Sequence, residues 1–309
     1  MMDRTDRHCR YLLRLLGPEM LLYTEMVVGQ AVLHGDQQRH LGYDPVEHPL
    51  ALQLGGSDPQ ILAEAAVAGA ERGYDEINLN IGCPSDRVQS GEFGACLMDQ
   101  PARVADCVSA IRERVAVPVT IKSRIGIDDK DDYAFLGDFV ASLSEAGVDT
   151  FIVHARKAIL AGLSPAENRT IPPLRYERVY QLKQDFPHLH ISINGGIRTT
   201  ADALSHLQHV DGVMIGRQAY ADPFWLSELH AAIFGTESLQ SRDGIVRQMA
   251  DYAAKAMSEG ARLNHVTRHM LGLYAGQRGA RAWRRFLSQE VHKPDAGPEL
   301  LVDSLRFVT

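Results

Sequence analysis

The cysteine at position 83 is the residue of this sequence best placed for chemistry. It lies between Gly82 and Pro84, directly after a strand-like run over residues 76–80. A Gly-Cys-Pro sequence makes the chain turn, so the thiol is expected at the open end of a strand. A thiol there can act as an acid or as a nucleophile. The alternative is a small buried packing residue, the commonest role of a free cysteine.

Two basic side chains, Lys122 and His154, end two consecutive strand-like runs. A lysine in such a place can form a Schiff base or lend positive charge to an anionic cofactor ring. Nothing nearby resembles a sugar-aldolase site, so the electrostatic role is preferred. His154 taken alone is equally well explained as a structural, hydrogen-bonded histidine. Together with Gln53 and Asn194, which end two further runs, the set offers donors suited to the pyrimidine-like edge of a flavin.

Glycines follow the last two strand-like runs, as Gly195-Gly196 and as Gly216-Arg217. Glycine lets backbone N–H groups approach phosphate oxygens closely, and an arginine adds a charged contact. Turns also need glycine for purely structural reasons. Two such turns on neighbouring strands favour a phosphorylated cofactor.

These side chains need a scaffold that brings strand ends together, and the order of the chain predicts one. Strands are predicted at 21–27, 50–54, 76–80, 118–122, 150–154, 190–194 and 212–215. Helical patterns between them occupy 58–72, 101–115, 131–146, 175–185 and 199–208. Repeated strand–helix units predict a (β/α)₈ TIM barrel, whose catalytic residues come from the carboxyl ends of its strands. Only seven strands are seen, so we expect the first strand to be truncated, its body preceding Met1.

The chain changes character after residue 235. Helices are predicted at 240–259, 262–275, 278–289 and 298–306, with no strand-like run among them. We therefore predict a barrel domain over residues 1–235 and an all-helical domain over 236–309. Residues 262–293 hold seven Lys/Arg and one Glu, a charge of +6 within a chain of net charge −7. A basic segment on an acidic body predicts a local surface for nucleic acid, and the alternative is a solvated helix face.

Composition restricts the class of protein. The 309 residues suffice for one large α/β domain and a smaller one. No apolar run approaches the roughly 20 residues of a membrane span, and the first ten residues lack a signal-peptide core. The cysteines at positions 9, 96 and 107 fall in helical contexts as packing residues, and no Cys or His pair has zinc-ligand spacing. We expect a cytoplasmic protein with free thiols and no metal.

Read in order, the strand ends resemble the tRNA-dihydrouridine synthase family, most closely its A subfamily. The motifs that carry the resemblance are MD (2–3) with TDR (5–7), LQLGG (52–56), NLNIGCPS (78–85), TIKSRIG (120–126), HARK (154–157), NGGI (194–197) and MIGR (214–217). Arg4 departs from the family, which usually has an aromatic residue there. They span essentially the whole chain, and seven motifs in the right order are far more specific than any one of them.

The resemblance implies FMN bound at the mouth of the barrel, with NADPH as the reductant. The residues it implies as FMN contacts are Met1, Gln53, Lys122, His154, Asn194, Gly195, Gly196, Gly216 and Arg217. It also implies the reaction. A hydride from the reduced flavin reaches C6 of uracil, and Cys83 protonates C5 from the opposite face of the ring.

The substrate implied by the resemblance is a uridine in the D-loop of tRNA, at positions 20 and 20a. Such a base must turn out of its loop to enter the mouth, where Asn80 is expected to contact it. The loop from Ser164 to Arg169 resembles a tRNA-contact loop of the subfamily, and Arg169 is its basic residue. Arg281 and Arg284, one helical turn apart, are expected to contact tRNA from the basic tail. A monomer suits this mode of binding.

Two other classes of function remain open at this point. A flavin barrel acting on a small free pyrimidine, as in dihydroorotate dehydrogenases, explains the strand ends but gives the basic tail no role. A tRNA-binding protein without catalysis explains the tail but gives no role to Cys83, Lys122 and His154.

Overall fold

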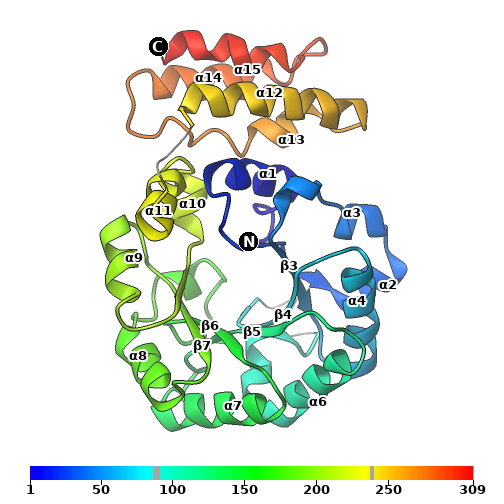
Figure 1. The fold of residues 1–309 in the computed structure, drawn as a ribbon, viewed down its shortest axis with the longest axis vertical. Helices are drawn as coiled ribbons and strands as arrows, with labels where there is room; N and C mark the ends of the chain where they lie inside the picture. The colour runs from blue at the N-terminus through cyan, green and yellow to red at the C-terminus, as the bar shows by residue number, and fades with distance from the viewer. Residues whose placement is uncertain (86–90, 237–239, 309) are drawn as a thin grey trace. The chain divides into compact units, whose positions relative to one another are not determined.

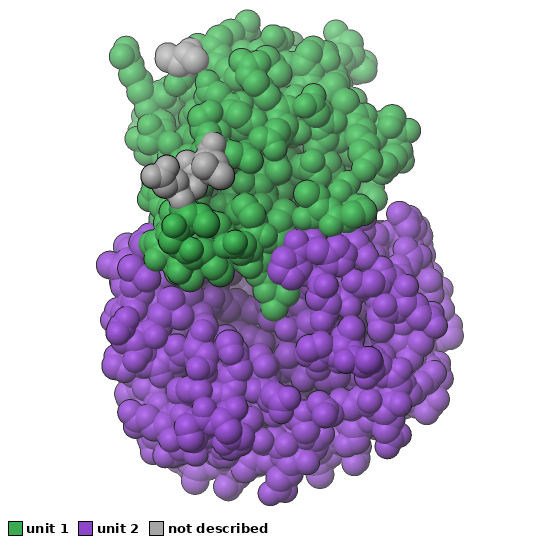
Figure 2. Space-filling view, in the orientation of Figure 1, with its two compact units in different colours: residues 1–22, 44–47, 216–309 green, residues 23–43, 48–215 purple. Residues whose placement is uncertain are grey.

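The computed structural model describes residues 1–85, 91–236 and 240–308 (Figure 1). The chain divides into two compact units, coloured separately in Figure 2. Unit 1 comprises residues 1–22, 44–47 and 216–309, and unit 2 comprises residues 23–43 and 48–215. The helices that follow residue 236 thus share a unit with chain from the amino terminus. The division into domains at residues 235 and 236 stays a prediction.

Unit 2 is built on a curled sheet with helices along its outer face (Figure 1). The strands are β1 (Leu22–Tyr23), β2 (Val27–Val28), β3 (Leu50–Gly55), β4 (Glu76–Ile81), β5 (Val119–Arg124), β6 (Thr150–His154), β7 (His190–Asn194) and β8 (Gly212–Met214). Their order is β1-β3-β4-β5-β6-β7-β8, and β2 pairs with β3. Each pair from β2–β3 to β7–β8 is parallel, so the carboxyl ends meet at one edge. The predicted (β/α)-barrel fold class is confirmed.

Six of the seven predicted strands are present with ends shifted by at most two residues. The run predicted as one strand over 21–27 instead forms the two short strands β1 and β2. Between them, Thr24 donates its N–H to Ala51 O at 3.0 Å, and its hydroxyl accepts the N–H of Gln53 at 2.9 Å. The side chain of Thr24 therefore takes the place of a backbone partner, which interrupts the ladder.

The two faces of the sheet differ in chemistry. On β4, Ile77, Leu79 and Ile81 are at most 2% exposed. A Cβ placed on Gly69 of the helix α4 (Pro59–Glu71) would lie 2.5 Å from Leu52 and 3.2 Å from Ile77, so these side chains face α4. Because side chains alternate along a strand, the residues between them face the opposite side.

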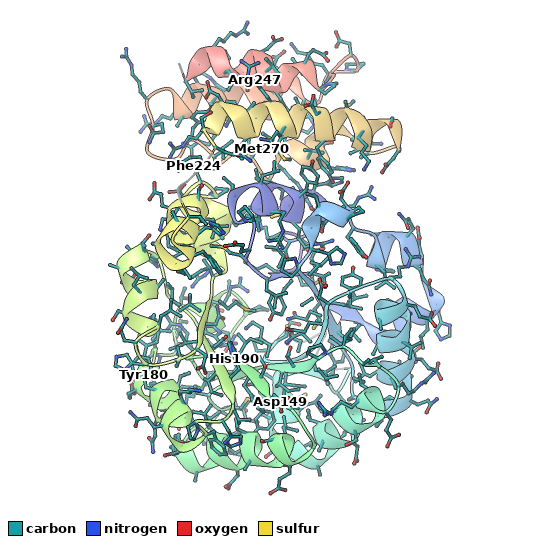
Figure 3. All side chains as sticks on the ribbon, viewed as in Figure 1. Asp149, Tyr180, His190, Phe224, Arg247 and Met270 are labelled. Atoms are coloured by element: carbon teal, nitrogen blue, oxygen red, sulfur yellow. The ribbon has the colours of Figure 1, made fainter. Side chains whose placement is uncertain are left out.

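Helices connect the strands of unit 2 and begin where the sequence supplies caps. They are α2 (Gly29–His34), α3 (Gln37–Leu41), α4, α6 (Pro101–Arg112), α7 (Tyr133–Glu145), α8 (Tyr176–Asp185) and α9 (Thr200–His206), with 3₁₀ turns η2 (Gly94–Asp99) and η3 (Glu167–Arg169). Asp58, Asp132 and Thr199 accept backbone N–H groups at the starts of α4, α7 and α9. Asp149 and His190, labelled in Figure 3, mark the amino ends of β6 and β7, opposite the edge that carries the predicted site.

Unit 1 is helical. Its elements are α1 (Arg7–Leu16), η1 (Pro45–Glu47), α10 (Arg217–Ala221), α11 (Trp225–Phe234), α12 (Arg242–Ser258), α13 (Leu263–Thr267), α14 (Ala280–Glu290), α15 (Glu299–Asp303) and η4 (Ser304–Phe307). Trp283, Met270 and Met249 are fully buried at its core, and Met270 is labelled in Figure 3. None of the helices in the described ranges is both long and apolar enough to cross a membrane.

The helix predicted over 262–275 is much shorter than expected. Only α13 is helical, and turns follow it. A Cβ on Gly272 would lie 2.4 Å from the carbonyl oxygen of Ala221, so the chain passes there against the backbone at the end of α10. This close approach within unit 1 replaces a regular helix, which side-chain periodicity alone could not reveal.

Segment 44–47 joins unit 1 through buried polar contacts. The carboxylate of Glu47 is 0% exposed and pairs with Nε of Arg10 at 2.6 Å. Arg14 donates to the carbonyl oxygen of Glu47 at 2.7 Å and to that of Gly17 at 2.9 Å. A buried pair of this kind is costly to break, because the remaining charge loses its partner.

Candidate active site

The predicted reactive side chains of unit 2 lie beside one another at the carboxyl edge of the sheet. Register places Asn80 opposite Lys122, and His154 opposite Asn194. Arg124 stands opposite His154. The parallel strands therefore bring into one neighbourhood residues that are far apart in the sequence.

Cys83 lies in a turn that Asn80 organises. The side-chain oxygen of Asn80 accepts the N–H of Gly82 at 3.1 Å and that of Cys83 at 3.0 Å. The carbonyl of Cys83 accepts the N–H of Ala95 at 2.9 Å. The thiol is half-buried, with Sγ 3.6 Å from the hydroxyl oxygen of Ser85. Cys9 and Cys107 are buried, whereas Cys83 combines partial exposure with a backbone held from both sides.

Gln53 connects this turn to the neighbouring strand. Its side-chain oxygen accepts from Nδ2 of Asn80 at 2.8 Å, and its Nε2 donates to Oδ1 of Asn78 at 2.8 Å. Gln53 is 7% exposed, so its amide has little freedom to rotate. Two of the predicted site residues thus form one hydrogen-bonded pair.

Lys122 lies on β5 and connects the site to residues of β7 and β8. Its Nζ donates to Oδ1 of Asn194 at 3.3 Å, and Nδ2 of Asn194 donates to the carbonyl of Met214 at 2.7 Å. Burial, assisted by the positive charge of Arg124 and opposed by Cys83, lowers the pKa of Lys122 to about 8. This amine therefore changes its charge near neutral pH.

The Gly195-Gly196 turn packs against His154. A Cβ on Gly195 would lie 2.6 Å from the imidazole, and Gly195 and Gly196 adopt φ of +117° and +75°, which other residues rarely do. Tyr176 donates its hydroxyl to the carbonyl of Gly195 at 2.8 Å. Within the described residues, neither glycine N–H donates a hydrogen bond. Both remain available to a ligand such as a phosphate.

Arg124 is a functional candidate that the sequence analysis did not single out. It is 4% exposed and donates to the carbonyls of Gly82 at 3.1 Å, Lys157 at 3.2 Å and Asn168 at 3.0 Å. It therefore joins the residue before Cys83 to the loop that follows β6. Lys122 and Arg124 are two residues apart on one strand, so the sequence indicates that both side chains lie on the same face. It does not show which groups Arg124 contacts.

The loop that carries Arg169 is held from within. Asn168 is fully buried, accepts the N–H of Ile159 at 2.7 Å and donates to its carbonyl at 2.8 Å. Glu167 accepts the hydroxyl and the N–H of Ser164. Arg169 itself is exposed at the end of η3.

Three predicted cofactor residues belong to unit 1. Gly216 precedes α10, which starts at Arg217, and a Cβ on Gly216 would lie 3.6 Å from the sulfur of Met1. The carbonyl of Met1 accepts the N–H groups of Arg4 and Thr5, both at 3.0 Å. Unit 1 thus brings Met1 beside Gly216, as the resemblance implies for two residues of one site.

The basic tail presents its arginines on one side of α14. Arg281 and Arg284 are exposed, whereas Trp283 and Leu287 of the same helix are fully buried. A hollow lined by eight of the residues between 276 and 285 includes Arg281, Arg284 and Arg285. The predicted tRNA contacts therefore point away from the packed core of unit 1.

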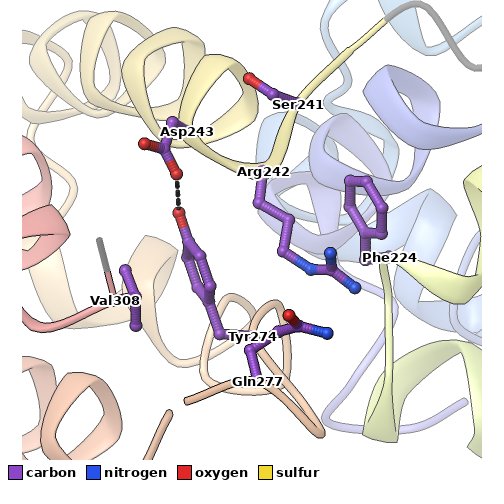
Figure 4. Close-up of a pocket in the computed structure, with 7 residues that line it drawn as sticks. All are labelled: Phe224, Ser241, Arg242, Asp243, Tyr274, Gln277 and Val308. Atoms are coloured by element: carbon purple, nitrogen blue, oxygen red, sulfur yellow. Dashed lines mark hydrogen bonds between the residues drawn. The ribbon is translucent and has the colours of Figure 1, made fainter. Parts of the chain in front are cut away.

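Unit 1 also contains a pocket of about 280 Å³ (Figure 4). Its lining residues are Phe224, Ser241, Arg242, Asp243, Tyr274, Gln277 and Val308. The guanidinium of Arg242 stacks 3.8 Å from the centre of the Phe224 ring, and Tyr274 donates to Asp243. None of the predicted site residues lines this pocket, and its charged groups have partners within it.

Comparisons with known proteins agree with the geometry. The model of the family described as dihydrouridine synthase matches residues 1–309. A tRNA-dihydrouridine(20/20a) synthase of Vibrio parahaemolyticus is 58% identical over 307 residues, covering 99% of this chain and 94% of the relative. Proteins of that name from Salmonella typhi and Escherichia coli K12 are 56% identical over 310 residues, covering the whole chain and 93% and 90% of the relatives. This chain therefore belongs to the dihydrouridine synthase family, and is an enzyme of that family.

Proposed function

We propose that this enzyme reduces uridine to 5,6-dihydrouridine in the D-loop of tRNA, at positions 20 and 20a. The names of its relatives state tRNA, dihydrouridine and the positions 20 and 20a. The observation that carries the proposal is the half-buried thiol of Cys83 in a turn fixed by Asn80. Asn80 itself donates to the amide of Gln53 and stands opposite Lys122. A proton donor and a set of polar groups for a flat ring thus share one edge of the sheet.

The residues at this edge fit FMN. The N–H groups of Gly195 and Gly196 have no partner among the described residues and suit a phosphate, and their left-handed backbone excludes side chains that would fill the space. The amides of Gln53 and Asn194 and the amine of Lys122 suit the polar edge of the flavin ring. We infer that His154 also contacts FMN, as do Met1, Gly216 and Arg217 from unit 1.

When bound and reduced by NADPH, FMN would supply the hydride for C6 of uracil. Lys122 would stabilise negative charge on the polar edge of the ring, because its amine is charged below a pKa of about 8. Cys83 would hold a proton on Sγ and give it to C5 of uracil. Asn80 would orient the base, since its side-chain nitrogen has a second N–H besides the one that it donates to Gln53.

We infer that tRNA is held by exposed positive charge. Arg169 at the end of η3, and Arg281 and Arg284 on α14, would contact its phosphates. In this view residues 1–235 bind the flavin and residues 236–309 bind tRNA. A monomer in the cytoplasm would suffice, because each part of the reaction has a place on one chain.

The decisive experiment incubates the purified protein, loaded with FMN, with NADPH and unmodified tRNA. Mass spectrometry of the digested nucleosides is expected to show dihydrouridine, and mapping is expected to place it at positions 20 and 20a. Free uridine and orotate serve as controls for an enzyme of small pyrimidines. Turnover of these controls without any product in tRNA would overturn the proposal.

A further inference from the structure

Strand β4 carries an unbroken polar face on the side away from α4. Its residues Glu76, Asn78 and Asn80 alternate with the buried Ile77, Leu79 and Ile81. Glu76 is 8% exposed and Asn78 is 0% exposed. The interior of a (β/α) barrel is normally filled by branched apolar residues, and a buried polar group is costly unless it is hydrogen-bonded. A polar face in this position therefore requires a role.

These side chains form one continuous chain of hydrogen bonds through unit 2. Asn80 donates to Gln53 at 2.8 Å, and Gln53 donates to Asn78 at 2.8 Å. Asn78 then donates to the hydroxyl of Thr120 at 2.8 Å, and that hydroxyl donates to Oε1 of Glu76 at 2.5 Å. Register explains the contacts, since Gln53, Asn78 and Thr120 stand opposite one another on β3, β4 and β5.

Every bond in this chain runs in the same direction. It starts at the N–H groups of Gly82 and Cys83, which donate to Asn80, and it ends at the carboxylate of Glu76. Tyr23 also hydrogen-bonds Glu76. Burial raises the pKa of Glu76, and the hydrogen bonds from Thr120 and Tyr23 oppose that rise. The backbone N–H groups at one end can only donate, and the carboxylate at the other end accepts, so both ends favour the same direction for every link between them.

We propose that Glu76, Thr120 and Asn78 are positioning residues that fix the side-chain amides of Gln53 and Asn80 and, through them, the turn of Cys83. The proposal rests on the proposed function, in which Gln53 contacts FMN and Asn80 contacts the base. An amide can exchange its oxygen and nitrogen by a half-turn, which would place a donor where the ligand needs an acceptor. With the chain intact, such a half-turn puts donor against donor at one of its two links and acceptor against acceptor at the other.

The test uses two substitutions of Thr120 that differ by the hydroxyl. Thr120→Val keeps the shape but removes both the acceptor for Asn78 and the donor to Glu76, and Thr120→Ser keeps the hydroxyl. Ser123→Ala is the matched control, because Ser123 lies on the same strand, is fully buried, and its hydroxyl oxygen has no partner among the described residues. Each protein is compared with the wild type for FMN affinity, for kcat and KM with tRNA at saturating FMN, and for hydrogen–deuterium exchange at Gly82 and Cys83.

For Thr120→Val we expect FMN to bind roughly tenfold more weakly and kcat on tRNA to fall on the order of tenfold to a hundredfold. KM for tRNA is expected to stay unchanged, and the amides of Gly82 and Cys83 to exchange faster. Thr120→Ser is expected to keep FMN affinity, kcat and the amide exchange rates close to those of the wild type. Ser123→Ala is also expected to resemble the wild type. A merely structural role would lower the melting temperature while leaving FMN affinity and kcat at 25 °C unchanged, which would overturn the proposal.

Glu76, the last residue of the hydrogen-bonded chain, provides a second variant for the case in which Thr120→Val does not fold. Glu76→Gln keeps the size of the side chain but can donate as well as accept, so this end of the chain no longer imposes the direction of the hydrogen bonds. Weaker FMN binding and lower kcat are expected, and values equal to the wild type would overturn the proposal. Wild-type protein is assayed alongside. If it forms no dihydrouridine, the proposed function fails, whereas a normal wild type with unaffected variants refutes the positioning chain alone.

Discussion

Two regions of this protein carry their polar side chains in opposite ways. Around Cys83, side chains such as Gln53 and Arg124 are buried and hydrogen-bonded to one another or to backbone carbonyls. On α14, Arg281 and Arg284 are exposed above a buried apolar face. Buried, fully paired groups hold fixed positions, whereas exposed charges act at longer range and are screened by salt. The difference indicates that the first region depends on geometry and the second on charge.

The largest effect is expected from Cys83→Ala. Loss of a positioned general acid typically costs 10²- to 10⁴-fold in rate, so dihydrouridine formation should fall by that range. Reduction of bound FMN by NADPH, followed by the loss of flavin absorbance, should proceed at the wild-type rate. Cys96→Ala is the control, because Cys96 lies outside the strand-end site. Wild-type turnover of tRNA by Cys83→Ala would remove the thiol from the mechanism.

A smaller but still large effect is expected from Arg124→Lys. Lysine keeps the charge but lacks the fork of donors that reaches three carbonyls. The turn before Cys83 should loosen, and kcat on tRNA should fall roughly tenfold to a hundredfold with little change in FMN reduction. The matched control is Arg103→Lys, since Arg103 donates to the carbonyl of Ser57 on the surface. Equal activities of the two variants would show that geometry near Cys83 is less critical than we infer.

The charge-dependent region should respond differently. Replacing Arg281 and Arg284 together by Ala is expected to raise KM for tRNA about tenfold, with kcat nearly unchanged. The slope of log KM against log salt should fall by about 1.5, since two phosphate contacts are lost. Arg247→Ala on α12, labelled in Figure 3, is the comparison on another helix of unit 1. An unaltered salt slope would show that Arg281 and Arg284 are solvated surface residues that do not contact tRNA.

The smallest expected effect is a dependence on pH that originates in Lys122. Its pKa is lowered to about 8, so its amine is charged below that pH and becomes neutral above it. FMN affinity of the protein should therefore be greatest below pH 8 and decline severalfold between pH 8 and 9.5. Lys122→Arg should shift that decline to higher pH, because a guanidinium keeps its charge. Identical profiles for both proteins would show that another group titrates.

Much of the scaffold could be predicted because strand–helix alternation is legible in the sequence. The strands predicted to end at Asn80, Lys122, His154 and Asn194 do end within two residues of these positions, which puts their side chains at one edge. The links among side chains could not be predicted. The contact of Asn78 with Thr120 joins residues 42 positions apart, and nothing in periodicity shows which amide pairs with which hydroxyl.

The candidate site was predicted only as a set of residues. Gln53, Lys122, His154, Asn194 and the glycine pair lie in unit 2, whereas Met1, Gly216 and Arg217 lie in unit 1. Their roles toward FMN stay predictions. Arg124 was missed because it acts by donating to three backbone carbonyls, and no sequence motif shows which carbonyls a side chain will reach.

Unit 1 is made of three separate segments, two of which the buried pair of Arg10 with Glu47 joins, and this has a consequence for how the enzyme can be recombined. Unit 1 takes in α1, the four residues 44–47 and everything from residue 216 onward, so the chain passes between the units four times. A tail exchanged between relatives at residue 236 would leave α1 and Glu47 behind in the recipient. Chimeras that are meant to transfer tRNA preference therefore need to carry all three segments together.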